Sequence, residues 1–319
     1  MFTSLLDKVS LGTPSTYRNL TLTPILLTDG LLVGIEPSNL EDALAAGTIA
    51  VTEVSRQGQV PELRVKNSGD TPVLILDGEE LVGAKQNRIV NITMLVAPQS
   101  EIVIPVSCIE AGRWAYSRLG FAAPGRVLNP DIRYRKAIAV TKNLKERRLR
   151  FADQGAVWDG VSKALFALGA ASPTSALSDG FDSRASDIND FLGVLKPQPE
   201  QIGLIYRIGG MLAGLDLFGS KAAFAGAFAK LVRGSALQAL AGLPIEHATQ
   251  LDDAQFLTRV LTTSGDRFAA VGLVQDIRFD SSEVGGGALE FNHVLVHLFA
   301  FPRPAEAMTH DQRGRAGLI

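Results

Sequence analysis

Short apolar runs at strand length dominate the first third of the chain, between Leu20 and Cys108. Each run is followed by turn-forming or polar residues, a pattern typical of β-strands. The runs are LTLTPILL, IAVTEV, ELRVK, PVLIL, RIVNITMLV and EIVIPVSC. Their alternating or clustered apolar positions favour an antiparallel sheet with at least one buried face. One short helix is predicted at residues 39–46, where Asn39 can cap the segment EDALAA.

Apolar positions recur every three or four residues after Asn129, and this spacing predicts helices. Two helices are the simplest account of DIRYRKAIAVTKNLKERRLR and VWDGVSKALFAL. A loop rich in Ser, Pro, Asp and Gly, ASPTSALSDGFDS, precedes a further helix in ASDINDFLGVL, which stops at KPQPE. The chain is therefore divided near residue 129, with helices linking two sheets.

The last third of the chain returns to strands. Gly209 and Gly210 stand between two apolar runs and can supply the positive φ angles of a tight hairpin. Three helical stretches follow, at residues 221–232, 236–241 and 252–261. The closing runs VGLVQDIRF, GALEFNH and VLVHLFAF predict a β-meander.

Together these patterns predict an α+β fold with an N-terminal, mainly antiparallel β region, central helices and a C-terminal antiparallel sheet with helices. The predicted domains are a β-rich domain at residues 1–129, which carries DGEELVGAKQNR, and an α+β domain at residues 130–319.

Composition narrows the classes of protein. The 319 residues are 46% hydrophobic and 20% charged, which is enough apolar material for a sizeable core. A formal net charge of −2 argues against a generally basic surface, so nucleic acid is not an expected partner. Cys108 is the single cysteine, which excludes an intrachain disulfide and a Cys-rich zinc cluster. Without a secretory signal or an apolar stretch of about 18 residues, we expect a cytoplasmic protein with no membrane segment.

The densest group of chemically versatile side chains lies in DGEELVGAKQNR. It combines three carboxylates, two amides and two cations, namely Asp77, Glu79, Glu80, Lys85, Gln86, Asn87 and Arg88. The carboxylates could coordinate a hard cation such as magnesium or act as general base, with Glu79 and Glu80 as the catalytic candidates. The cations could hold phosphate or carboxylate, and the amides suit a base or a sugar. The alternative is a charged hairpin whose surface ion pairs are worth only about 0–1 kcal/mol each.

A second group follows an apolar strand in PVSCIEAGRW. Arg113 can grip an anion and Trp114 can stack on a flat ring, and Glu110 is a further ligand-binding candidate. Trp114 as a cap on a core is the alternative. Cys108 would be a nucleophile only with a lowered thiol pKa, and no histidine lies nearby in sequence to act as its base. We therefore favour a small buried cysteine.

Other polar residues give weaker signals. His293 and His297 lie four apart, but in a strand-like segment without an HExxH pattern, so no metal site is predicted there. His297 is expected to be a lone acid–base group or a satisfied core histidine. Asp216, in the apolar GLDLF, would need a partner if it were buried. The basic run at residues 133–150 is most simply a solvated helix face. Walker, Rossmann and GxSxG motifs are absent from the sequence.

Five segments resemble a known family, the "ARG and rhodanese-phosphatase-superfamily-associated protein" domain family, where ARG denotes ADP-ribosylglycohydrolase. They are DGEELVGAKQNRIVN, PVSCIEAGRW, VWDGV, GLDLFGS and GGGALEFNHVLVHL. The resemblance runs over most of the chain, and KQNR and CIEAGRW are its most specific parts. It implies a genomic association with enzymes that process ADP-ribose or nucleotides, and it supplies no assigned catalytic residues.

We therefore predict a protein that binds, and as an enzyme would process, a nucleotide or an ADP-ribose-type small molecule at the two polar groups. The alternative is a non-catalytic scaffold or oligomeric interaction module, in which the charged hairpin joins subunits or a partner protein. A homo-oligomer is compatible with both hypotheses. No cofactor is assigned beyond the magnesium ion that the carboxylates could hold.

Overall fold

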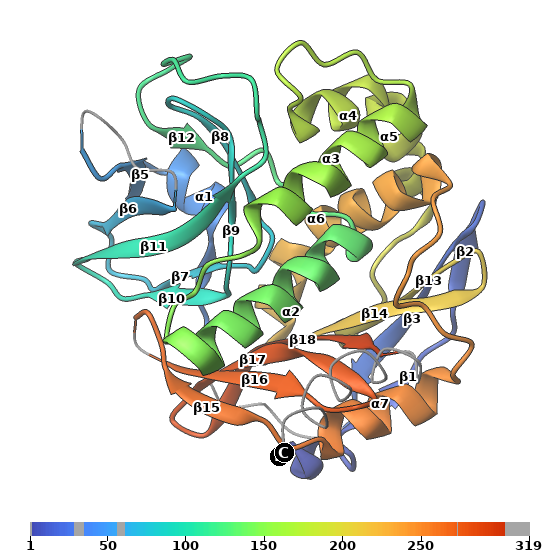
Figure 1. Cartoon of the computed structure of the whole chain (residues 1–319). Helices are drawn as coiled ribbons and strands as arrows, with labels where there is room; N and C mark the ends of the chain where they lie inside the picture. Colours follow the sequence, from blue (N-terminus) through green and yellow to red (C-terminus); the bar gives the residue numbers. More distant parts are fainter. Residues whose placement is uncertain (1, 29–34, 56–60, 273, 304–319) are drawn as a thin grey trace, which may run out of the picture.

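The computed structural model describes residues 2–28, 35–55, 61–272 and 274–303. Two mainly antiparallel sheets lie on either side of a group of helices (Figure 1). This arrangement confirms the predicted α+β fold class. No helix in the described part of the chain is long and apolar enough to cross a membrane.

The larger sheet has the strand order β1-β3-β13-β14-β18-β17-β16-β15, with β2 attached to β3. Its strands are β1 (Val9–Leu11), β2 (Ser15–Tyr17), β3 (Leu20–Leu27), β13 (Gln201–Ile208), β14 (Met211–Phe218), β15 (Asp266–Ala269), β16 (Gln275–Asp280), β17 (Val284–Phe291) and β18 (Val294–Pro302). The hairpin at Gly209–Gly210 and the closing meander form as predicted. Because β3 pairs with β13, this sheet takes strands from both sides of residue 129.

The smaller sheet has the order β12-β8-β9-β11-β6-β5. Its strands are β5 (Ile49–Glu53), β6 (Glu62–Asn67), β8 (Glu80–Gly83), β9 (Arg88–Val90), β11 (Ser100–Cys108) and β12 (Phe121–Ala122). The two outermost strands, β12 and β5, contact each other, so the sheet curls back on itself. Its inner face encloses a separate apolar cluster that includes Val51, Val65, Leu81 and Val90.

A third sheet of three short strands joins the smaller sheet to the helices, in the order β10-β7-β4. Its strands are β4 (Ser38–Asn39), β7 (Val73–Ile75) and β10 (Met94–Val96). The run RIVNITMLV, predicted as one strand, divides into β9 and β10. Asn91 and Thr93 lie between them. The Asn91 side chain donates to the Arg150 carbonyl at 3.0 Å, and the Thr93 hydroxyl lies 3.0 Å from His297 Nδ1.

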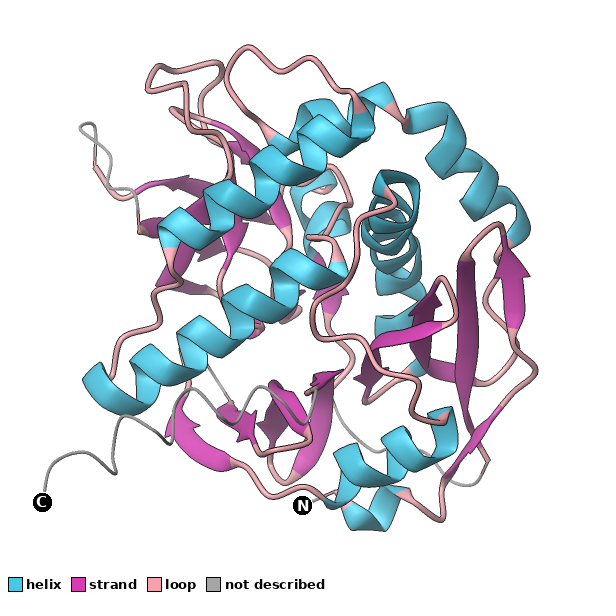
Figure 2. Ribbon diagram, turned by 45° about the vertical axis from the view of Figure 1, so that its right-hand side comes forward, coloured by secondary structure: helices cyan, strands magenta, loops and turns pink. Residues whose placement is uncertain are grey.

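Two of the helices begin at asparagine side chains that cap them, and the first of these caps, Asn39, was predicted from the sequence. The Asn39 side chain accepts a hydrogen bond from the Asp42 amide at 2.8 Å. The Asn129 side chain, directly before Pro130, accepts one from the Ile132 amide at 3.1 Å. The helices are α1 (Leu40–Ala45), α2 (Pro130–Arg147), α3 (Gln154–Leu168), α4 (Leu177–Ser183), α5 (Ala185–Val194), α6 (Lys221–Ala241) and α7 (Asp253–Thr262). Figure 2 shows the long helices crossing between the sheets.

Helix α6 corrects one prediction. The sequence suggests separate stretches at residues 221–232 and 236–241, but the helix is continuous through Gly234 and Ser235. A Cβ atom on Gly234 would lie 2.8 Å from the carbonyl oxygens of Val127 and Leu128. Glycine is used here for close approach of the helix to a neighbouring backbone and does not break it.

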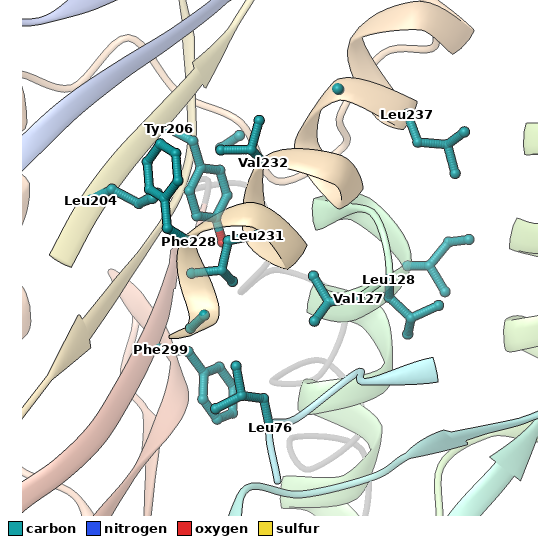
Figure 3. Packing of buried hydrophobic residues seen from close by; sticks show 14 of the residues in the cluster. Leu76, Val127, Leu128, Leu204, Tyr206, Phe228, Leu231, Val232, Leu237 and Phe299 are labelled. Atoms are coloured by element: carbon teal, nitrogen blue, oxygen red, sulfur yellow. The ribbon is translucent and has the colours of Figure 1, made fainter. Parts of the chain in front are cut away.

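The main core surrounds α6 (Figure 3). On one side Phe228 and Val232 pack with Tyr206 of β13, and on the other Val127 and Leu128 come from the segment that follows β12. Helix α6 therefore joins the two larger sheets through one continuous apolar cluster.

Candidate functional site

The hairpin β8–β9 carries most of the predicted polar residues. Glu80 pairs with Ile89 and Leu81 pairs with Arg88, so neighbouring side chains point to opposite faces. Asp77, Glu79, Glu80 and Arg88 are all buried. Surface ion pairs, the alternative considered from the sequence, are therefore excluded for these four residues.

Asp77 lies between two cations of α2. Its carboxylate accepts hydrogen bonds from Arg133 Nε at 3.1 Å and from Lys136 Nζ at 2.5 Å. Burial lowers the Lys136 pKa to about 8, against the opposing attraction of Asp77. The expected solvated face of the basic run is wrong for Arg133 and Lys136, because both side chains are buried against this carboxylate.

Asp216 on β14 extends this buried network and has the partner that its burial demands. Its carboxylate accepts hydrogen bonds from Arg133 Nη1 and Nη2, each at 2.7 Å, and its Oδ1 lies 3.0 Å from His297 Nε2. Burial opposes the ionisation of Asp216, but the Arg133 charge and the His297 hydrogen bond outweigh it and lower the Asp216 pKa. His297 also contacts Thr93, so it is a satisfied core histidine. His293 lies exposed in the β17–β18 turn and shares no site with it.

Glu79 points to Lys230 of α6. Lys230 Nζ lies 2.6 Å from Glu79 Oε1 and 2.6 Å from Glu41 Oε2, and the second Glu79 oxygen accepts the Leu76 amide at 2.8 Å. Burial raises the Glu79 pKa to about 7 although the Lys230 charge opposes this. Lys230 also lines a pocket of about 200 Å³ between α6 and strands β4 and β7.

Glu80 points to Arg126 and α4. It is 1% exposed, and its Oε2 lies 3.7 Å from Arg126 Nη1. Neither carboxylate oxygen has a hydrogen-bond partner among the residues that the structure describes. Burial raises the Glu80 pKa to about 7. Arg126 also pairs with Asp182 of α4.

The three carboxylates of the hairpin thus diverge to α2, α6 and α4. They do not form one ligand set for a magnesium ion. Within residues 2–28, 35–55, 61–272 and 274–303, no group of three His, Cys, Asp or Glu residues is placed to hold a metal ion.

The remaining predicted residues gather at the other end of the hairpin. Arg113 grips Glu110 through Nε–Oε1 at 2.8 Å and Nη2–Oε2 at 2.7 Å. Its Nη1 donates to the carbonyl oxygens of Ala84 and Ala115, each at 2.7 Å. Arg113 therefore fastens the loop at residues 111–120 to the β8–β9 turn.

The two amides of the turn are held by the same residues. The side-chain oxygen of Asn87, Oδ1, accepts hydrogen bonds from Gly83 N and Arg113 Nη2, each at 3.1 Å. The backbone N–H of Asn87 donates to Glu110 Oε2 at 2.9 Å. Gln86 Nε2 donates to the Glu110 carbonyl at 2.5 Å. These contacts fix the turn, and they place Arg88 directly beneath the loop.

Arg88 is the most unusual residue of this group. Its side chain is fully buried, and Nη1 donates to Gln86 Oε1 at 2.9 Å. Nε and Nη2 have no hydrogen-bond partner in the described part of the chain. The guanidinium carbon lies 5.6 Å from the ring centre of Trp114, which is 48% exposed. Lys85 Nζ lies 5.3 Å from the same ring.

Sequence reasoning missed Glu53, the last residue of β5. Both of its carboxylate oxygens are buried and lack hydrogen-bond partners among the described residues. Its negative charge favours the charged form of Arg88, whose pKa is nevertheless lowered because burial is the larger influence. A single Glu at a strand end gives no signal in the sequence. Which charges it faces depends on how the smaller sheet curls.

Cys108 pairs with Arg88 across β11 and β9 and is buried. Its Sγ donates to the Glu110 carbonyl at 3.1 Å. Burial raises the pKa of the thiol, so the nearby Arg88 does not turn it into a ready thiolate. This environment fits the small buried cysteine favoured from the sequence.

The fold and these contacts define the class: an α+β protein whose smaller, curled sheet carries a buried arginine beneath an exposed aromatic loop. The chain belongs to the ARG and Rhodanese-Phosphatase-superfamily-associated Protein domain family, whose model matches residues 8–301. The resemblance found in the sequence is thereby confirmed. A search of the curated proteins and a search of the solved structures each found no match.

Proposed function

We propose that this chain binds a nucleotide or an ADP-ribose-type ligand at the Arg88 site, which comprises Lys85, Arg88, Trp114 and the turn residues Gln86 and Asn87. One observation carries the proposal: a fully buried guanidinium group keeps two nitrogens without hydrogen-bond partners among the described residues. Leaving a buried donor unpaired costs about 1–3 kcal/mol. A ligand that supplies acceptors recovers this cost.

The surroundings of Arg88 suit a ligand with a flat ring and negative charge. Trp114 offers an exposed indole, and base–aromatic stacking is worth about 1–3 kcal/mol per base. Lys85 adds a cation beside the same ring. Arg88 itself is covered, so the ligand gains access when Trp114 swings outward. Residues 111–120 form no helix or strand, but the amides of Ala115 and Ser117 donate to the carbonyls of Lys85 and Ala84, so the proposed movement is that of the Trp114 side chain and not of the whole loop.

The family description also supports a ligand of this kind, because it names the ADP-ribosylglycohydrolase and rhodanese-phosphatase groups as associates. Processing of the ligand would need an acid–base group. The sequence offers Glu79 and Glu80 as catalytic candidates, but Glu80 points to the opposite face of the hairpin from Arg88, and Glu79 is engaged with Lys230. We therefore propose binding of the ligand and assign neither carboxylate a catalytic role at the Arg88 site.

Calorimetric titration with AMP, ADP, GDP, NAD and ADP-ribose tests the proposal. We expect at least one of these ligands to bind the wild type, and Trp114→Ala to weaken that binding about tenfold through lost stacking. Lys85→Ala should also weaken it, while Arg64→Ala, which removes an exposed cation of the same sheet, should not. If no ligand binds, or if Trp114→Ala and Lys85→Ala both bind like the wild type, the proposal fails.

A second candidate function is that of an assembly module. Trp114, Tyr116 and Leu119 are exposed large apolar residues of one loop, and such clusters mark interaction surfaces. Static light scattering tests this second function. A stable oligomer that Leu119→Glu disperses would favour assembly, and a wild-type monomer would exclude self-assembly through this loop.

A further inference from the structure

The pocket of about 200 Å³ between α6 and strands β4 and β7 is separate from the Arg88 site, since no residue of that site lines it. Its apolar wall consists of Leu74 in β7 and Leu76 just beyond this strand. An apolar cavity of about 150 Å³ is large enough to hold benzene, so this pocket has space for a ligand of roughly six to ten non-hydrogen atoms.

Helix α6 leaves this space open because it turns small side chains towards the pocket. Ala222, Ala223 and Ala227 line it. Gly226 lies so close to Asn39 that an added Cβ would be 2.8 Å from the Asn39 Nδ2 atom. A larger residue at any of the lining positions would therefore occupy the volume that a ligand needs.

Lys230 forms the inner end of the pocket, because it lines the space and is only 3% exposed. Glu41 and Glu79 each accept one of its N–H groups, at 2.6 Å. An ammonium group has three donors, and no third acceptor is present among the described residues. One donor is thus left for a ligand oxygen. The two carboxylates that hold Lys230 would repel an anionic oxygen, so a neutral hydroxyl or carbonyl oxygen fits this end.

Asp42 supplies charge at the outer end of the pocket. It is an exposed lining residue, and its Oδ2 accepts a hydrogen bond from Asn39 Nδ2 at 2.9 Å. None of the ion pairs between described residues includes Asp42. Because the Lys230 charge is balanced by carboxylates and the Asp42 charge by no cation, the lining favours a ligand with a positive charge near the solvent.

We propose that this pocket binds a small primary amine that carries a hydroxyl or carbonyl oxygen at its other end. The ligand's ammonium group contacts Asp42, its carbon chain lies against Leu74, Leu76 and Ala227, and its neutral oxygen accepts the remaining N–H of Lys230. Glu79 then has the role of holding Lys230 in place as a donor. This inference does not depend on nucleotide binding at the Arg88 site.

A set of probes with the same four-carbon chain separates the two polar contacts. 4-Amino-1-butanol carries both groups, butylamine lacks the oxygen, 1,4-butanediol lacks the charge, and 4-hydroxybutyrate reverses the charge. Titration by ligand-detected NMR measures their affinities for the wild-type protein. We expect 4-amino-1-butanol to bind about fivefold more tightly than butylamine or 1,4-butanediol, and 4-hydroxybutyrate not to bind.

Variants of the lining place the binding in this pocket. Ala223→Leu fills the space and should weaken 4-amino-1-butanol at least tenfold. Ala225→Leu puts the same side chain at an exposed position of α6 outside the lining and should leave the affinity unchanged. Asp42→Asn should weaken 4-amino-1-butanol about fivefold and leave 1,4-butanediol unchanged, whereas the exposed Asp190→Asn should affect neither.

Three results would each overturn the inference: no binding of 4-amino-1-butanol, binding of 4-hydroxybutyrate at equal or higher affinity, or wild-type affinity in a folded Ala223→Leu variant. If Ala223→Leu does not fold, the ranking of the probes and the effect of Asp42→Asn decide. The nucleotide titrations at the Arg88 site use other ligands and other variants, so the failure of one proposal leaves the other standing.

Discussion

The Glu80 carboxyl group has Arg126 as its nearby cation, at 3.7 Å, and no hydrogen-bond donor within the described residues. Burial raises its pKa from 4.5 to about 7, so the folded protein holds this proton more tightly than the unfolded chain. Its contribution to stability is therefore complete below about pH 4.5 and is lost as the pH rises towards 7. At pH 8 the folded state carries a buried charge at a net cost.

The variant Glu80→Gln tests this reasoning. Glutamine cannot ionise, so at pH 8 the variant should be more stable than the wild type, by up to about 3 kcal/mol. The difference should shrink towards zero at pH 4.5. Urea denaturation at both pH values measures it, with the exposed Glu101→Gln as control. A variant that is less stable at pH 8 would mean that attraction to Arg126 exceeds the cost of burial.

For individual residues, the sequence identified the polar side chains but not the partners that each of them contacts. Asp77, Glu79 and Glu80 lie within four positions, yet their carboxylates have different partners: α2 for Asp77, α6 for Glu79, and for Glu80 the Arg126 side chain, which also pairs with α4. The gathering of Arg88, Glu110, Arg113 and Trp114 could be predicted because strands bring both motifs to one edge. The burial of Glu53 could not, since the sequence does not reveal that β5 closes against β12.

Among the elements, α6 shows how a helical glycine can be constrained by tertiary contacts. An exposed Gly→Ala change in a helix usually stabilises a protein by about 0.4–1 kcal/mol. Gly193 in α5 has no atom within 4 Å of an added Cβ, whereas at Gly234 two backbone carbonyl oxygens lie 2.8 Å away. Backbone atoms cannot move aside as a flexible side chain can.

The two glycines form a matched pair. Gly193→Ala should raise the free energy of unfolding by about 0.5 kcal/mol, and Gly234→Ala should lower it by about 1–3 kcal/mol through overpacking. Chemical denaturation of both variants measures the effects. Equal stabilisation by the two changes would show that α6 can shift away from Val127 and Leu128.

The loop at residues 111–120 depends on Arg113 for its position. Lysine cannot reproduce the fork that holds Glu110 while also reaching the carbonyls of Ala84 and Ala115. Arg113→Lys should therefore speed amide exchange in this loop and change global stability by only about 1 kcal/mol. Hydrogen exchange by mass spectrometry measures this, with Arg64→Lys as the exposed control. Unchanged exchange would assign the loop's order to other contacts.

Element prediction succeeded where the signal is local. Asn39 caps α1, and Gly209–Gly210 closes the β13–β14 hairpin, because capping and turn formation depend on neighbouring residues. The continuity of α6 was missed because the reason for Gly234 lies about one hundred residues earlier, at Val127 and Leu128.

At the scale of the whole molecule, two connections join the parts of the chain on either side of residue 129. Strand β3 pairs along its length with β13, and periodicity alone cannot reveal which strands become neighbours. The buried network of Asp77, Arg133, Asp216 and His297 runs from the β7–β8 turn through α2 to β14 and β18. We therefore expect the described parts to unfold as one cooperative unit.

The variant Asp216→Asn tests this coupling. It removes one charge of the buried network and leaves Arg133 paired with Asp77 alone, which should cost about 3–5 kcal/mol of stability. Asp190→Asn, at an exposed position of α5, should cost less than about 0.5 kcal/mol. Tryptophan fluorescence reports on the loop and α3, and far-ultraviolet circular dichroism reports on all elements. In each protein both signals should change in one transition with the same midpoint. That midpoint should be lower in the variant than in the wild type. Two separate transitions, or a loss below about 1 kcal/mol, would show that β3–β13 pairing and the α6 core join the sheets without help from these charges.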